Sequence, residues 1–243
     1  VHGRYALVRN AICILVSFYK NMMLSMTQFY YAFYTGFSGQ TMYDGWLLSF
    51  YNFAFTSVPP LFMGIFEKDI QEEVLVEKPA LYPPLGDGLY FSPKTIAMWF
   101  FEAIVHSLIL FFLAQPTQKQ QDLGHRQMDG LMFGTIIISA MIFLALSKMT
   151  LHMRYWTGFE AGALIFSVVL FLVFLLCYAA IPNLFGDSSL YFTTFMLMGD
   201  AKFWLYVLLF VVGLLIPIDL SIIFLQKQIN PTLRDCAQEE LMK

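Results

Sequence analysis

The sequence predicts an all-α membrane protein built as a bundle of six transmembrane helices. Of its 243 residues, 58% are apolar and only 13% are charged, whereas a soluble domain carries about 25% charged residues. The apolar residues also gather into runs of roughly 20, the length that an α-helix needs to cross the hydrocarbon core of a bilayer. Because most charged residues fall between these runs, the chain is expected to cross the membrane several times.

The six predicted spans cover approximately residues 6–33, 46–66, 96–114, 131–147, 158–181 and 203–225, and residues 226–243 form a tail. The fourth run is short, so we expect flanking residues to extend its helix. No internal repeat is visible, which disfavours a secondary transporter built from inverted repeats.

The distribution of Lys and Arg predicts how the bundle is oriented. With six spans, both termini share a side with the connections after the second and fourth spans. Ten basic residues fall on that side and three on the other. The ten are Arg4, Arg9, Lys68, Lys78, Lys94, Lys148, Arg154, Lys227, Arg234 and Lys243, and the three are Lys119, Arg126 and Lys202. Basic residues favour the cytosolic side, so both termini are expected to be cytosolic.

The first span contains a lysine, Lys20, that is followed directly by Asn21. It lies roughly ten residues beyond Arg9, about 15 Å along a helix and too deep for easy snorkelling. A charge at this depth costs about 2.5–3.5 kcal/mol on insertion scales. Helical spacing places it on a polar stripe that consists of Ser17, Lys20, Asn21, Leu24, Thr27 and Gln28. Such a stripe is expected to face protein or a hydrated path, not lipid tails.

The second span repeats this pattern. Ser49, Asn52 and Thr56 follow i, i+3, i+7 spacing, which predicts a shared helix face. Pro59 and Pro60 then remove two backbone donors, so the helix is expected to kink or unwind. Two interpretations stay open here: a transport path lined by polar groups, or a packing kink whose polar residues bond across helices.

The remaining polar residues of the spans carry weaker signals. Glu102 and His106 are i, i+4 neighbours and are expected to form a structural pair, with a relay as the alternative. Glu160 is expected to be a solvated charge at the interface, and Asp219 to cap or bond a neighbouring helix. The three cysteines and the acidic residues show no spacing typical of a disulfide framework or a metal site. No block of like charge suggests a nucleic-acid partner.

Several motifs closely resemble the type-IV P-type ATPases, the phospholipid flippases. They extend along essentially the whole chain and read "VHGRYALVR", "FYKN", "MTQFYY", "FSGQTMYDGW", "LSFYNFAFTSVPP", "HSLILFF", "FGTIIIS", "RYWT", "LLIPIDL" and "NPTLRDCAQEE". The resemblance implies that the six spans are the fifth to tenth helices of a ten-helix transport domain. It also implies an ATP-driven translocase that moves aminophospholipid or a related lipid from the exoplasmic to the cytosolic leaflet.

The resemblance further implies parts that this sequence does not contain. The sequence has no DKTGT phosphorylation motif, and its first residue is Val1 instead of a methionine. We therefore expect a portion of a longer chain that is not catalytic alone. Mg and ATP are expected to bind in cytosolic domains outside it. An accessory two-span β-subunit is an implied partner, and the plasma membrane, Golgi or endosomes of a eukaryote are the implied locations.

Carried over from the family, Lys20, Asn21 and Asn52 lie beside the path of the lipid head group, and Pro59 and Pro60 break the helix that rearranges. The first two spans contain no Asp or Glu, which disfavours a site for a divalent cation, since such ions usually need carboxylate ligands. Two alternatives remain: the membrane domain of a cation-transporting P-type ATPase, and a non-catalytic truncated membrane module or scramblase.

Overall fold

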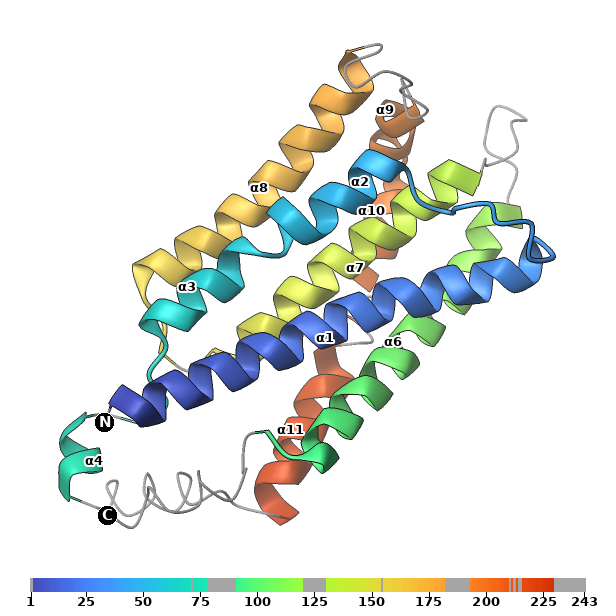
Figure 1. Cartoon of the computed structure of the whole chain (residues 1–243). Helices are drawn as coiled ribbons and strands as arrows, with labels where there is room; N and C mark the ends of the chain where they lie inside the picture. The colour runs from blue at the N-terminus through green and yellow to red at the C-terminus, as the bar shows by residue number, and fades with distance from the viewer. Residues whose placement is uncertain are drawn as a thin grey trace.

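The computed structural model describes residues 2–70, 72–77, 91–119, 130–153, 155–181, 193–209, 211, 213 and 216–229. Within these ranges all regular secondary structure is helical (Figure 1), which confirms the predicted all-α class for the described residues. The helices are α1 (His2–Tyr34), α2 (Gly45–Phe50), η1 (Tyr51–Phe55), α3 (Val58–Phe66), α4 (Glu72–Glu77), α6 (Pro93–Lys119), α7 (Gly130–His152), α8 (Gly158–Ala180), α9 (Thr193–Gly199), α10 (Ala201–Leu208) and α11 (Ile216–Ile229).

Four of the described helices, α1, α6, α7 and α8, are long and apolar enough to cross a membrane. They contain the first, third, fourth and fifth predicted spans. The fourth run is extended on both sides, to Gly130 and to His152, as its shortness predicted. The second predicted span is interrupted, because α2, η1 and α3 divide it. The sixth predicted span contains α10 and the beginning of α11.

Helix α7 occupies the centre of the bundle (Figure 1). It contacts α1, α3, α6, α9, α10 and α11. Its apolar side chains surround the whole helix, and most of those between Met132 and Met149 are buried. A helix that is apolar on every side is stable only when neighbours cover every side. The sequence of α7 therefore determines its central place.

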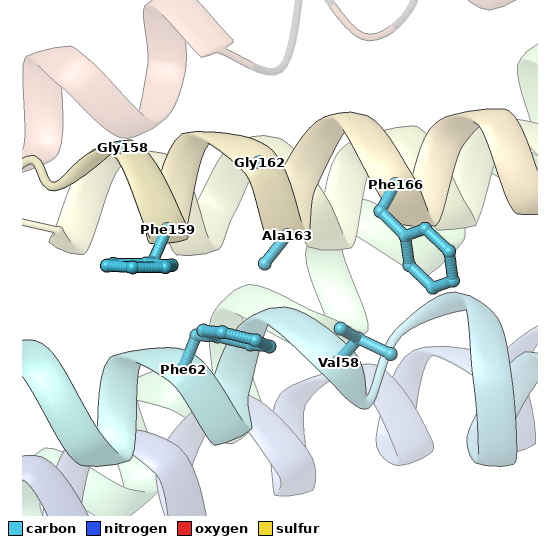
Figure 2. Close-up of a pocket in the computed structure, with 7 residues that line it drawn as sticks. All are labelled: Val58, Phe62, Gly158, Phe159, Gly162, Ala163 and Phe166. Carbon is cyan, nitrogen blue, oxygen red and sulfur yellow. The ribbon is translucent and has the colours of Figure 1, made fainter.

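The outer helices pack in two groups on α7. Helix α1 lies along α6, and α3 lies along α8, where the ring of Phe66 stacks on that of Phe159 at 5.3 Å. Small residues on α8 leave an apolar groove of about 400 Å³ between α3 and α8 (Figure 2). Val58, Phe62, Gly158, Phe159, Gly162, Ala163 and Phe166 line it.

The connection between α1 and α2 is pressed against α7. Gln28 holds it by accepting a hydrogen bond from the Met42 amide (3.1 Å) and donating one to the Gln40 carbonyl (3.1 Å). The Met42 carbonyl oxygen then lies where Gly134 of α7 has no side chain, and a Cβ there would approach it to 1.9 Å. Gly134 is thus required by the close approach of another backbone.

We expect Gly134→Ala to destabilise the protein by about 1–3 kcal/mol, because a backbone carbonyl and not a flexible side chain would have to move. The measurement is the melting temperature of the full-length protein in detergent. Gly162→Ala is the matched control, since nothing lies within 4 Å of a Cβ at Gly162 and alanine favours a helix. Equal melting temperatures for the two variants would contradict this account of Gly134.

Candidate functional site

The second predicted span is broken at its middle. The chain winds as α2, continues as the π-helix η1, and turns at Thr56 and Ser57 before α3 begins at Val58. Pro59 and Pro60 lie in the first turn of α3, where a missing N–H removes no intrahelical bond. The hydroxyl of Thr56 donates to the Tyr51 carbonyl (2.6 Å), so the side chain satisfies a backbone group at the break.

Lys20 of α1 lies against this break. Its Nζ donates to Thr56 Oγ1 at 2.9 Å, and its carbonyl accepts a hydrogen bond from the Tyr51 hydroxyl at 3.2 Å. Lys20 is only 6% exposed. Among the residues that the structure describes, no carboxylate forms an ion pair with it. A buried ammonium is therefore held by a neutral hydroxyl, which leaves its charge uncompensated.

The other predicted head-group residues lie differently. Asn21 and Asn52 are exposed on the surface of the bundle, whereas Lys20 is turned inward. Ser49 and Asn52 are exposed while Thr56 is buried, so the predicted common face of the second span is wrong at Thr56. The i, i+7 spacing assumed 3.6 residues per turn, and the π-helix η1 is wound more widely.

The polar stripe of α1 is likewise divided. Thr27 is buried, and its hydroxyl lies 2.6 Å from that of Tyr43. Gln28 binds the connection to α2. This half of the stripe faces protein, one of the two environments that the sequence predicted. Lys20 and Asn21 remain as the part of the stripe beside the break.

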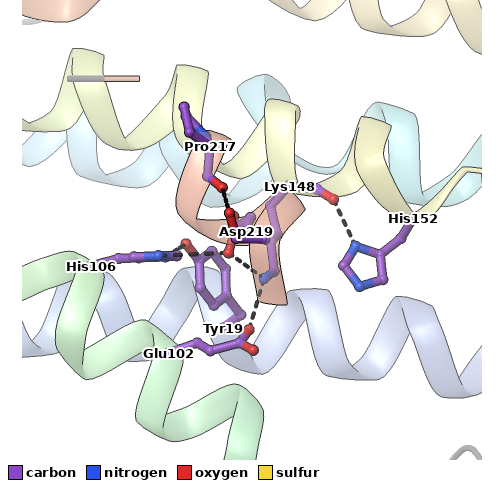
Figure 3. Close-up of polar contacts among 8 residues, drawn as sticks. Tyr19, Glu102, His106, Lys148, His152, Pro217 and Asp219 are labelled. Atoms are coloured by element: carbon purple, nitrogen blue, oxygen red, sulfur yellow. Dashed lines mark hydrogen bonds and ion pairs between the residues drawn. The ribbon is translucent and has the colours of Figure 1, made fainter. Parts of the chain in front are cut away.

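A second buried polar cluster joins four helices (Figure 3). Nζ of Lys148 on α7 lies 2.7 Å from Glu102 Oε2 of α6 and 2.9 Å from Asp219 Oδ1 of α11. His106 of α6 places Nε2 at 3.6 Å from the same Asp219 oxygen. From α1, the Tyr19 hydroxyl lies 2.6 Å from His106 Nδ1. Lys148, unlike Lys20, is thus neutralised by carboxylates.

Three expectations about single residues are corrected here. Glu102 pairs with Lys148 and not with His106, because the facing helix offers a full charge. Glu160 is fully buried and closes a capping box with Thr157 at the start of α8, where the amide groups of the first turn need an acceptor. Lys148, counted among the basic residues of the connections, is buried inside α7. Asp219 bonds a neighbouring helix as expected.

The sequence did carry a signal for this cluster. Glu102 and Asp219 lie in the third and sixth predicted spans, and Lys148, of opposite sign, directly follows the fourth. Charges within spanning helices pair with one another. In the described part of the chain no group of three or more His, Cys, Asp or Glu residues could hold a metal ion.

Comparison with known proteins agrees with these features. Residues 1–232 match the family model described as "Phospholipid-translocating P-type ATPase C-terminal". The chain belongs to the phospholipid-translocating P-type ATPase family. The resemblance seen in the sequence motifs is thereby confirmed, and with the apolar helices it identifies an integral, multi-pass membrane protein.

The relatives are phospholipid-transporting ATPases of several eukaryotes. A phospholipid-transporting ATPase of Schizosaccharomyces pombe is 34% identical over 212 residues, 84% of this chain and 16% of that protein. Phospholipid-transporting ATPase IC of Xenopus tropicalis is 31% identical over 252 aligned positions, 99% of this chain and 20% of that protein. The chain therefore spans about a fifth or less of the length of the curated relatives that it matches.

We expect Lys148→Met to destabilise the full-length protein by about 3–5 kcal/mol, because it leaves two carboxylates in the bundle without their counter-charge. The measurement is the melting temperature in detergent. Lys202→Met is the matched control, since Lys202 is exposed at the start of α10. Adding Glu102→Gln and Asp219→Asn to Lys148→Met should restore much of the loss. A single variant as stable as the control would contradict this account of the cluster.

Proposed function

We propose that this chain is the C-terminal membrane part of an ATP-driven phospholipid flippase. It would move aminophospholipid or a related lipid from the exoplasmic to the cytosolic leaflet and would contribute part of the head-group path. The names of the relatives support the lipid substrate class. ATP and Mg would bind in cytosolic domains of the parent chain, and residues 1–243 would form one membrane unit of it.

The observation that carries this proposal is that no carboxylate of the described residues compensates the charge of Lys20. Its ammonium is buried, is bonded to the neutral Thr56 hydroxyl, and lies at a broken span. A fixed cation of this kind repels metal ions and attracts a phosphate or carboxylate oxygen, the charged groups of a phospholipid head. Asn21 and Asn52, exposed on the same two segments, would add amide donors and acceptors along the path.

The broken span suggests how the path changes. Helices α2 and α3 are separate units joined by η1 and the turn at Thr56 and Ser57. Interrupted helices in transporters commonly present backbone groups to a solute at mid-membrane. Pro59 and Pro60 keep α3 from joining the preceding helix, so α3 could shift relative to α2 as the head group passes.

The alternative of a cation pump is less well supported. Helices α6 and α11 do carry carboxylates that face the bundle, the partly buried Glu102 and the buried Asp219. Both are bound by Lys148, whose ammonium lies where a transported cation would have to bind. ATP hydrolysis that depends on ions and not on lipid would favour this alternative.

The remaining parts of the proposal concern topology and partners. With α2–η1–α3 forming one interrupted span and α10 and α11 belonging to another span, the chain would cross the membrane six times with both termini cytosolic. In Figure 1, α1, α6 and α8 run in one direction, whereas the segment α2–η1–α3 and helix α7 run back between them, which supports this alternation. An accessory two-span β-subunit would bind the side opposite the termini. The host membrane would be the plasma membrane, the Golgi or endosomes.

We expect Lys20→Ala in the full-length enzyme to raise the lipid concentration that half-stimulates ATP hydrolysis by roughly 10-fold or more, because a charge-assisted hydrogen bond to the head group is lost. Uptake of labelled lipid into the cytosolic leaflet should fall in parallel. Lys94→Ala, at an exposed lysine near the start of α6, is the control. Unchanged lipid dependence and turnover in the Lys20 variant would refute the proposed path.

A further inference from the structure

Helix α1 sends two consecutive side chains into two different polar centres. Successive residues of an α-helix point about 100° apart. Tyr19 therefore points toward α6 and α7, where the Lys148 cluster lies (Figure 3), and Lys20 points toward the break in the second span. One turn of α1 therefore contributes a side chain to the Lys148 cluster and the next side chain to the break in the second span.

Tyr19 is held on its side by several contacts. Its side chain is fully buried, and its hydroxyl lies 2.6 Å from His106 Nδ1. The Lys148 ammonium lies 5.5 Å from the centre of its ring, a cation–π distance. The ring also meets Trp99 of α6 edge-on at 6.1 Å. These contacts determine the rotation of α1 relative to α6 and α7.

The two centres differ in how readily they can change. The cluster of Lys148, Glu102 and Asp219 ties three helices together by buried ion pairs, and separating any of them would leave an unpaired buried charge. The break is held around Lys20 by a hydrogen bond from its ammonium to the neutral Thr56 hydroxyl and by one from the Tyr51 hydroxyl to its carbonyl. Among the described residues no ion pair would have to separate there. The cluster is the rigid reference, and the segment formed by η1 and α3 is the part able to shift.

We propose that Tyr19 is a positioning residue for lipid transport: it fastens the turn of α1 that carries Lys20 to the Lys148 cluster. Lys20 then keeps its place relative to α6, α7 and α11 while η1 and α3 rearrange around it. Tyr19 touches no substrate and acts through Lys20. This inference rests on the proposed role of Lys20 in the head-group path.

The test is Tyr19→Phe in the full-length enzyme, which keeps the ring and removes the hydrogen bond to His106. We expect the half-stimulating lipid concentration to rise about 2- to 10-fold, the value of one hydrogen bond, with the maximal rate changed less than twofold. Tyr5→Phe is the matched control, because Tyr5 lies on the same helix and donates an equally short bond to the Ile70 carbonyl (2.6 Å). It should affect stability without changing the lipid dependence.

A double-mutant cycle separates positioning from general stabilisation. In a Lys20→Ala background, Tyr19→Phe should cause no further change in lipid dependence, since the residue through which it acts is gone. His106→Leu removes the partner of the same bond and also the contact of His106 with Asp219. It should shift the lipid dependence at least as much as Tyr19→Phe, so it replaces that variant if the latter does not fold.

The outcomes distinguish this inference from the function on which it rests. No effect of Lys20→Ala on lipid dependence would overturn the proposed function and the inference with it. Two results would overturn the positioning role alone. In the first, Lys20→Ala changes the lipid dependence and Tyr19→Phe does not. In the second, both variants change it and their effects add in the double variant. A shift with Tyr5→Phe as large as with Tyr19→Phe would also overturn it, because any loosened bond of α1 would then suffice.

Discussion

A buried ammonium has to be compensated, and the way this is done for Lys148 organises the bundle. Its Nζ bonds Glu102 of α6 and Asp219 of α11, so α6, α7 and α11 meet at one group. An apolar environment makes such a contact directional, since a carboxylate or ammonium that loses its partner there has no water to replace it. Apolar side chains around α7 could pack with the neighbouring helices at several positions along it, whereas the ion pairs form at only one.

Lys20 presents the opposite solution to the same physical problem. It is nearly as buried as Lys148, yet its described partner is the hydroxyl of Thr56 and not a carboxylate. Net stability alone gives no reason to place an uncompensated charge in a spanning helix. The cost of burying this charge has a physical reason if an anionic ligand pairs with Lys20 during transport, as the head group of a phospholipid, the substrate that the relatives' names give, would. Under the proposed function, the partners of the two lysines distinguish a structural role for Lys148 from a transport role for Lys20.

The broken span shows the same division between rigid and adaptable parts. A continuous helix would have satisfied its backbone internally and could have moved only as a rod. Here the side chains of Thr56 and Lys20 hold the break, together with the Tyr51 hydroxyl. Because α1 contributes to the break through Lys20 and to the ion cluster through Tyr19, a single helical turn connects the adaptable part with the rigid one.

The sequence by itself determined the class, the family and most long helices. Runs of apolar residues are a local property, and they predicted α1, α6, α7 and α8. The two prolines, Pro59 and Pro60, predicted the interruption of the second span. Lys20 was recognisable because a lone lysine in an apolar run is costly wherever the run packs. Only the tertiary structure decided the partners: Glu102 with Lys148 and not with His106, Glu160 inside a capping box, and Thr56 turned inward by η1. Such pairings depend on which helices face each other and on local departures from 3.6 residues per turn. The spacing of residues along a single helix gives no information about either.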